Sequence, residues 1–492
     1  MSRNRVLIFT EITLRFIVIL WGITESVYGC LQLYDFMDSN HHLYKLTGSF
    51  QNPGPYGGFL ASILPLALWQ ALENKSSDKH ISQVFSCLSW GYIFLCCILL
   101  PATLSRASWL AATIGCGIVI VAHYKASSRL RQFIREHRQQ SILWFCLFCL
   151  LAAAATAGIY YLKKDSADGR LLMWKVTTRI IAGHPFFGVG KGNFTGAYGQ
   201  AQAAYFAEGT ASAQEEYVAG CPEYAFNEFL QIAAENGLFG LTLFLAVLLL
   251  AFRQAARNQQ TGIIGSLTAL LIFACFSYPF SVRQLSALFI LLLLMPVFQK
   301  KRAPKNIYAL AAGILLVAIP WAQEEIHLFK KRKAVQAWHS EQSFYNMEIY
   351  EGTVNNYRAL YPELPDEPKF LFELGQCLAK TGNFQESNRI LQEGAVQSSD
   401  PMFWNVMGKN YQHLCHFREA EQCFLHAYHM VPNRLYPLYL LANLYFACGQ
   451  EEKGIRIAQQ VIDTSPKVMS SAIQEMKAEM KEKLKIHSNG RK

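Results

Sequence analysis

The first 325 residues consist of long apolar runs separated by short polar loops, and this pattern limits the possible folds more than any other feature of the chain. A membrane-spanning helix needs about 20 mostly apolar residues, and in lipid only helices and closed barrels satisfy the backbone. We therefore predict an all-α, polytopic bundle of nine spans. The predicted spans are 11–33, 57–73, 83–102, 107–123, 141–161, 237–252, 262–280, 285–298 and 306–322.

Composition separates this membrane domain, residues 1–325, from the rest of the chain. Hydrophobic residues make up 52% of the chain and charged residues 16%, fewer than the roughly 25% charged residues of a soluble domain. Beyond residue 325, charged and amide side chains occur throughout, which predicts a soluble domain. The net charge of +10 does not indicate nucleic-acid binding, because the basic residues of the membrane half lie mostly in short loops.

Those basic loops predict the orientation of the spans. The loops after the second, fourth, sixth and eighth spans carry Lys or Arg, as do the first five residues. If nine spans alternate, all of these segments fall on one side, which the positive-inside rule assigns to the cytoplasm. The large loop 162–236 and the C-terminal domain are then predicted to lie outside. A long loop rich in glycine and aromatic residues is usually functional.

The C-terminal domain contains an internal repeat. Segments 367–400, 401–434 and 435–468 align with a period of 34 residues, with small residues and prolines at matching positions. This pattern resembles tetratricopeptide repeats, which form a helical solenoid with a concave binding surface. We expect 326–366 to be a helical connector or a degenerate repeat, and 469–492 to be a charged helical tail. The domain would bind a partner protein or, alternatively, only cap the membrane domain.

Two polar motifs lie at the predicted outer ends of spans. Gly48–Gly58, which contains Asn52, enters the second span. Its backbone N–H groups could meet an anion, or the stretch could be an ordinary turn. Ser105 and Arg106 lie between the third and fourth spans. Arg106 would either bind a phosphate bidentately or extend toward the membrane interface.

A third motif begins in the large loop at Arg170. Arg170 and Trp174 are four residues apart, so a helix would place both on one face, where a cation and an aromatic ring suit a diphosphate and a sugar. Arg179 lies about half a turn away from that face. It would reach the ligand only if the ligand wraps around the helix or the helix ends early, and a solvated or lipid-headgroup contact is the other interpretation. His184 precedes a glycine-rich stretch that includes Lys191 and could let the backbone approach a ligand.

A fourth motif, Glu223 to Gly240, leads into the sixth span. Glu223, Asn227 and Glu228 are predicted to lie near the membrane surface. The segment is either part of a site or the capped start of an amphipathic helix.

Together these motifs resemble those of the O-antigen ligase and polymerase superfamily of bacterial membrane glycosyltransferases. The resemblance covers residues 45–300, and a tetratricopeptide tail also resembles some members. It implies a C-type glycosyltransferase-like fold in the bacterial inner membrane, with an active site and repeat domain on the periplasmic side. The donor would be a glycan on undecaprenyl diphosphate, and the acceptor a lipid A-core, another glycan or a protein hydroxyl. No metal and no cofactor are expected.

The resemblance also implies roles for residues. The catalytic candidates are Arg106 and Arg170, which would stabilise charge on the leaving diphosphate, and Glu223 or His184, which would accept the proton of the attacking hydroxyl. The expected substrate-binding residues are Ser105, Asn52, Trp174, Arg179, Lys191 and Asn227. Where the ligase pattern usually has His, this chain has Phe226. Members also have more spans before the first motif, so we expect a compact variant or a chain that lacks N-terminal helices.

Ligases and polymerases share these motifs, so both activities stay open, as does protein O-glycosylation. The non-enzymatic alternative is a membrane scaffold that recruits envelope proteins through its repeat domain.

Overall fold

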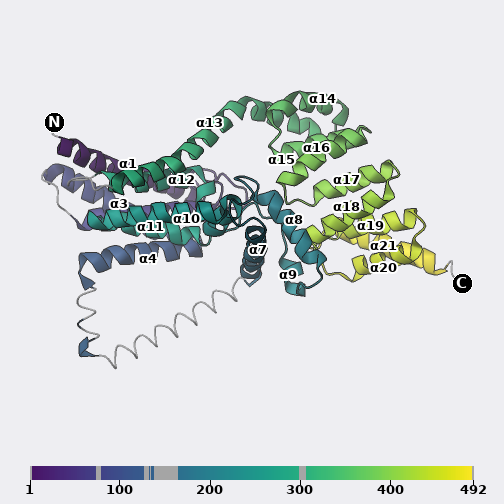
Figure 1. The fold of residues 1–492 in the computed structure, drawn as a ribbon, viewed down its shortest axis with the longest axis horizontal. Coiled ribbons are helices and arrows are strands. Elements are labelled where there is room, and N and C mark those ends of the chain that lie inside the picture. Colours follow the sequence, from purple (N-terminus) through teal and green to yellow (C-terminus); the bar gives the residue numbers. More distant parts are fainter. Residues whose placement is uncertain are drawn as a thin grey trace. The chain divides into compact units, whose positions relative to one another are not determined.

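The computed structural model describes residues 3–73, 79–126, 132, 135–137, 164–298 and 306–489. Every regular element in these ranges is a helix (Figure 1). The chain divides into two compact units. Unit 1 contains Met1–Tyr161, Phe226–Phe229 and Phe239–Glu324, and unit 2 contains Leu162–Ala225, Leu230–Leu238 and Glu325–Lys492.

Unit 1 is the apolar bundle. Its helices are α1 (Arg3–Leu33), α2 (Pro53–Leu72), α3 (Lys79–Ala102), α4 (Arg106–His123), most of α10 (Glu228–Arg257), α11 (Thr261–Ala274), α12 (Arg283–Leu294) and the start of α13 (Asn306–Asn346), with short 3-10 helices η1 (Pro279–Ser281) and η2 (Met295–Val297). Helix α2 is buried along most of its length and packs against α3, α4 and α11. It is therefore the central helix of the bundle.

Helices α4 and α11 cross where two glycines meet. A Cβ atom on Gly265 would lie 2.7 Å from the carbonyl oxygen of Gly115, and one on Gly115 would lie 2.8 Å from that of Gly265. The two backbones are thus in direct contact. Packing of small residues is the usual way in which helices associate where lipid removes the hydrophobic driving force.

The described part of the chain holds five helices long and apolar enough to cross a membrane, and each overlaps a predicted span. They are Thr10–Leu33, Gln83–Ala102, Arg106–His123, Glu228–Arg257 and Tyr308–Asn346. The predicted spans 57–73, 262–280 and 285–298 fall on α2, α11 and α12, which are not among the five. The predicted span 141–161 lies outside the described residues.

The predicted boundaries were wrong at several helices, for local reasons. Helix α11 ends at Ala274, because Pro279 begins a 3-10 helix soon afterwards, and Pro296 lies in another 3-10 helix just past the end of α12. Helix α10 begins nine residues before the predicted 237, with a break at Gly237. Helix α13 contains Pro320 and continues beyond 322, the end of the predicted span, to Asn346.

Unit 2 contains the large loop and the C-terminal domain. Its helices are α7 (Lys164–Gly183), α8 (Phe194–Ala207), α9 (Ala213–Val218), the end of α13, α14 (Tyr350–Leu360), α15 (Pro368–Lys380), α16 (Phe384–Gln397), α17 (Met402–His413), α18 (Phe417–Met430), α19 (Tyr436–Ala447), α20 (Glu451–Asp463) and α21 (Ser471–Asn489), with the 3-10 helix η3 (Tyr361–Glu363). The large loop is therefore mostly helical. Turns and bends occupy residues 184–193, between α7 and α8.

The C-terminal domain is built of helix pairs with the same turn. In the pairs α13–α14, α15–α16, α17–α18 and α19–α20 the turn contains one residue with positive φ: Glu348, Gly382, Cys415 and Gly449. In each turn the next residue donates its N–H to the carbonyl five positions back, as Asn383 does to Leu378 and Gln450 to Tyr445. This is the Schellman arrangement, and its recurrence gives a structural repeat. Assignment to the tetratricopeptide class stays a proposal.

Candidate functional site

The start of α2 does not offer the anion-binding backbone that was considered for Gly48–Gly58. Pro53 and Pro55 have no N–H group. The N–H of Gly54 donates to Asn52 Oδ1 at 2.8 Å, and that of Tyr56 to the carbonyl of Asn52 at 3.3 Å. The first turn of the helix therefore has its donors satisfied or missing, and Asn52 acts as an N-cap.

The two glycines that follow allow close packing. A Cβ atom on Gly57 would lie 2.9 Å from Ser108 Oγ, and one on Gly58 would lie 2.4 Å from the ring of Phe273. The stretch 48–58 is thus explained by a turn and by helix contacts within unit 1.

Arg106 is the first residue of α4, directly after a capping serine. Ser105 Oγ accepts the N–H of Ser108 at 3.4 Å and lies 2.7 Å from Ser108 Oγ. Leu104 adopts the left-handed conformation, with φ of 51°, which turns the chain sharply into the helix. Arg106 is half-buried. Its side chain lies at the end of α4 where the helix dipole is positive.

The start of α10 is also capped by a polar side chain. Asn227 Oδ1 accepts the N–H of Phe229 at 3.1 Å, so Asn227 caps the helix. Glu228 is buried, and its Oε1 accepts the N–H of Phe280 at 2.7 Å. The ring of Phe226, at the position where the ligase pattern has His, packs edge-on against Tyr278. Glu228 therefore lies inside unit 1, not exposed at a surface.

In unit 2, Arg170 and Trp174 both lie on α7, four residues apart. Leu172, Val176 and Ile180 form the buried face of this helix. The indole Nε1 of Trp174 donates to the carbonyl of Ala225 at 3.1 Å. This bond fixes the ring and holds the segment before α10 against the face of α7 that carries Arg170.

Arg179 lies on a different part of α7 and is engaged in an ion pair. Its guanidinium donates to both carboxylate oxygens of Glu208, at 2.6 and 3.0 Å, and stacks over Tyr205. Lys175 pairs with Glu215 at 2.7 Å. Burial alone would raise the pKa of Glu215, but hydrogen bonds from Lys175, Ser212 and Tyr205 lower it to about 2. These contacts tie α7 to α8 and α9, and neither the solvated nor the lipid-headgroup interpretation of Arg179 included them.

The glycine-rich turn after α7 forms backbone hydrogen bonds with the first part of α10. The pairs are Val189 N to Ala234 O at 2.9 Å, Gly190 N to Glu235 O at 2.9 Å and Leu238 N to Pro185 O at 2.8 Å. From the sequence, these two segments were interpreted as separate motifs. The structure joins them within unit 2.

The glycines of this turn are required because the two backbones touch. A Cβ atom on Gly237 would lie 2.1 Å from the carbonyl oxygen of Phe186, and one on Gly188 would lie 2.4 Å from the carbonyl carbon of Glu235. Both glycines have φ of 68°, where other residues are rare. The close approach predicted for a ligand is therefore made by the chain itself.

The remaining predicted residues of unit 2 are exposed. His184 follows the last residue of α7, and Lys191 lies in the glycine-rich turn. Glu223 has an exposed side chain, and its carbonyl accepts the hydroxyl of Thr195 at 3.3 Å. The bond between Trp174 and Ala225 places Ala225, two residues after Glu223, against α7.

Sequence reasoning missed two polar residues at the centre of this region. Gln231 is buried, accepts the N–H of Ala225 at 2.8 Å and donates to Glu235 at 3.0 Å. Glu235 also accepts the N–H of Gly192 at 3.3 Å. The spacing of four residues between Gln231 and Glu235 could have indicated that the two side chains meet on one helix face.

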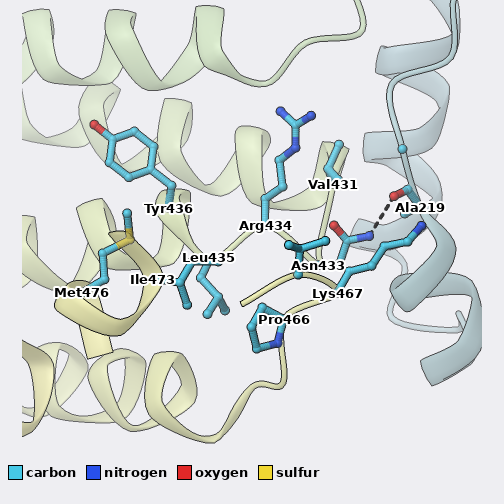
Figure 2. A pocket seen from close by; sticks show the side chains of 12 residues that line it. Ala219, Val431, Asn433, Arg434, Leu435, Tyr436, Pro466, Lys467, Ile473 and Met476 are labelled. Atoms are coloured by element: carbon cyan, nitrogen blue, oxygen red, sulfur yellow. Dashed lines mark hydrogen bonds between the residues drawn. The ribbon is translucent and has the colours of Figure 1, made fainter. Parts of the chain in front are cut away.

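The structure also bears on metal binding, and it contains a pocket. In the described ranges no three His, Cys, Asp or Glu side chains lie close enough to hold a metal ion, and metal-independent chemistry stays a prediction. Unit 2 also has a pocket of about 400 Å³ that contains none of the predicted site residues. It lies between Ala219 and Gly220, the turn before α19 and the segment that leads into α21, with apolar residues such as Leu435 and Ile473 on its walls (Figure 2).

Comparison with known proteins agrees with the main indication of the sequence. A model of the O-antigen ligase family matches residues 91–245. The matched stretch runs from α3 into α10 and contains Arg106, Arg170 and the glycine-rich turn, but not the helix pairs. A comparison with curated proteins gives no match. The match and the apolar helices support a membrane protein with a ligase- or polymerase-like glycan-transfer function.

Proposed function

We propose that this protein transfers a glycan from a polyprenyl-diphosphate carrier to a hydroxyl acceptor at the periplasmic face of the bacterial inner membrane. The observation that carries the proposal is the match of residues 91–245 to the O-antigen ligase family. The matched stretch contains both arginines expected to meet a diphosphate.

The position of Arg106 supports a role with an anion. Arg106 is in the first turn of α4, and an anionic ligand there would be attracted by both the guanidinium and the positive end of the helix dipole. Ser105 then serves as a cap that fixes where α4 begins and thus where Arg106 projects.

The α7 face supports a complementary role in binding the donor. Arg170 and Trp174 share this face, and the indole ring is held by its bond to Ala225. Arginine binds phosphate oxygens bidentately, and an aromatic ring offers an apolar surface to a sugar. Arg179 is left out of the proposed site, because it lies on another part of α7, where it pairs with Glu208.

The proposed reaction is a direct, inverting displacement. The acceptor hydroxyl attacks the anomeric carbon, the bond from that carbon to the diphosphate oxygen breaks, and the carrier diphosphate leaves as an anion. Fixed cations stabilise the charge that develops on the leaving group. The proton of the hydroxyl passes to a carboxylate or an imidazole.

Of the two proton acceptors, Glu223 suits the proposal better than His184. His184 lies about 20 Å along the axis of α7 from Arg170, at 1.5 Å per residue. Glu223 is two residues from Ala225, which is hydrogen bonded to Trp174 on the same face as Arg170. We therefore assign the base to Glu223.

The test compares two arginines of one helix in cells that lack the chromosomal gene. Arg170→Ala should lower glycan transfer on the order of 10²-fold, which is typical for losing one group that stabilises transition-state charge. Arg179→Ala, the matched control, should retain most of the transfer. Surface glycans would be followed by gel, with membrane levels of each variant measured by immunoblot. Normal transfer by Arg170→Ala at normal protein level would refute the assignment.

A further inference from the structure

The large loop and the helix pairs of unit 2 are joined through a face of α8 made of small residues. Gly196, Gly199 and Ala203 recur at intervals of three and four, so they lie on one side of the helix. A Cβ atom on Gly196 would lie 1.7 Å from the carbonyl oxygen of Val396, and one on Gly199 would lie 3.0 Å from Ser399 Cα. The α8 backbone therefore packs directly on the end of α16.

Two amide side chains hold the loop at this contact. Asn433, in the turn between α18 and α19, donates to the carbonyls of Glu216, Tyr217 and Ala219 at 3.2, 2.9 and 2.7 Å. Figure 2 shows the last of these bonds. Gln202 of α8 is buried and donates to the carbonyls of Met430 and Gly220. Carbonyls of the α9 end and of the repeat domain are thus satisfied across the contact.

The loop helices held in this way are in turn bonded to α7. Glu215 of α9 accepts hydrogen bonds from Lys175 of α7 at 2.7 Å and from Tyr205 of α8 at 2.8 Å. Glu208, at the end of α8, pairs with Arg179. A continuous set of bonds therefore runs from the turn at Asn433 through α9 and α8 to the helix that carries Arg170.

We propose that the repeat domain acts on the chain's own loop, and that Asn433 and Gln202 are positioning residues that set the α7 face for glycan transfer. This inference rests on the proposed function of Arg170. In this role the repeat domain binds the large loop of the same chain through the surface formed by α16, α18 and the turn 431–434.

The chain contains a natural reporter of this contact. Cys221 follows α9 and packs against Ala203, Met430 and Val431. Burial raises the pKa of its thiol to about 11, and only the thiolate reacts with a maleimide. Release of the loop would expose Cys221 and return its pKa to the ordinary range near 8.5. Cys415 is exposed in the same domain and serves as the internal control.

The first experiment measures labelling of Cys221 by N-ethylmaleimide in membranes containing the full chain, with peptides resolved by mass spectrometry. Asn433→Ala and Gly196→Ala should speed the labelling of Cys221 by about tenfold or more, since each removes bonds or forces the two backbones apart. Labelling of Cys415 should not change. Gly183→Ala, where an added Cβ atom meets nothing within 4 Å, is the matched glycine control. Unchanged labelling of Cys221 in both test variants would overturn the inference.

The second experiment measures transfer kinetics, with purified variants, lipid-linked glycan extracted from the deletion strain, and membranes of that strain as acceptor. A smaller folded fraction would lower kcat alone, whereas a displaced Arg170 should also raise KM for the donor, by about tenfold. Increased labelling of Cys221 with wild-type kcat and KM would refute the positioning role and leave the proposed function intact. Full activity of Arg170→Ala would instead refute the site assignment on which the inference rests.

Discussion

Gly237→Ala tests the junction between the glycine-rich turn and α10. Gly237 has φ of 68° and ψ of −176°, a region that is essentially restricted to glycine and costs another residue about 1–3 kcal/mol. The new Cβ atom would also lie 2.1 Å from the carbonyl oxygen of Phe186, so the two segments must separate. Three backbone hydrogen bonds join them, each contributing about 1 kcal/mol. The junction should therefore lose about 4 to 6 kcal/mol of local stability.

The assay is hydrogen exchange by mass spectrometry on the detergent-solubilised protein, following peptides that contain the amides of Val189 and Gly190. A loss of about 4 kcal/mol corresponds to roughly 10³-fold faster exchange if these amides exchange by local opening. Gly183→Ala is the control, because its Cβ atom would enter open space. Unchanged exchange of Val189 and Gly190 in Gly237→Ala would refute the steric argument for the junction.

Three further predictions concern stability. Ser105→Ala and Asn227→Ala should each lower the free energy of unfolding by about 1 kcal/mol through loss of a helix cap, which denaturant titration would measure. Ser105→Asp should retain most of the wild-type stability. An unchanged free energy of unfolding in Ser105→Ala would contradict the cap. Gly265→Val should lower the thermal midpoint of the bundle, because Gly115 leaves no room for a side chain, and an unchanged midpoint would contradict the crossing. The pKa of Glu215 is lowered in the folded protein to about 2. The contribution of this carboxylate to folding stability is therefore complete above its pKa in the unfolded chain, near 4.3, and is lost as pH falls toward 2. Thermal midpoints of Glu215→Gln should therefore fall less steeply than those of wild type over that window, and parallel curves would contradict the pairing.

Local features of the sequence predicted much of the fold. Apolar runs located the five long helices, since span length and hydropathy are properties of a short segment. The recurring turns at residues 382, 415 and 449 follow the period visible in the sequence, and the turn at 348 lies in the segment expected to be a connector or a degenerate repeat. The spacing of Arg170 and Trp174 indicated that a helix would place both on one face, and both lie on α7.

Features that depend on distant contacts were not predicted. The glycines after His184 were expected to let the backbone approach a ligand, but Gly188 meets the backbone of Glu235 instead, and no single segment carries that information. By contrast, the helix caps at Asn52, Ser105 and Asn227, which were expected to bind substrate, are local, because each side chain bonds an N–H two or three residues further on. Polar side chains at helix starts serve both purposes, and only geometry separates them.

The most direct test of the central claim is the pool of lipid-linked glycan in cells that lack this gene, measured by mass spectrometry. The account predicts that the donor accumulates, that wild type restores the pool, and that Arg170→Ala does not. Accumulated full-length donor with bare acceptor would identify a ligase, and single-unit donor with lost chain length would identify a polymerase. An unchanged donor pool with normal surface glycans in the deletion strain would contradict the claim that this protein transfers glycans.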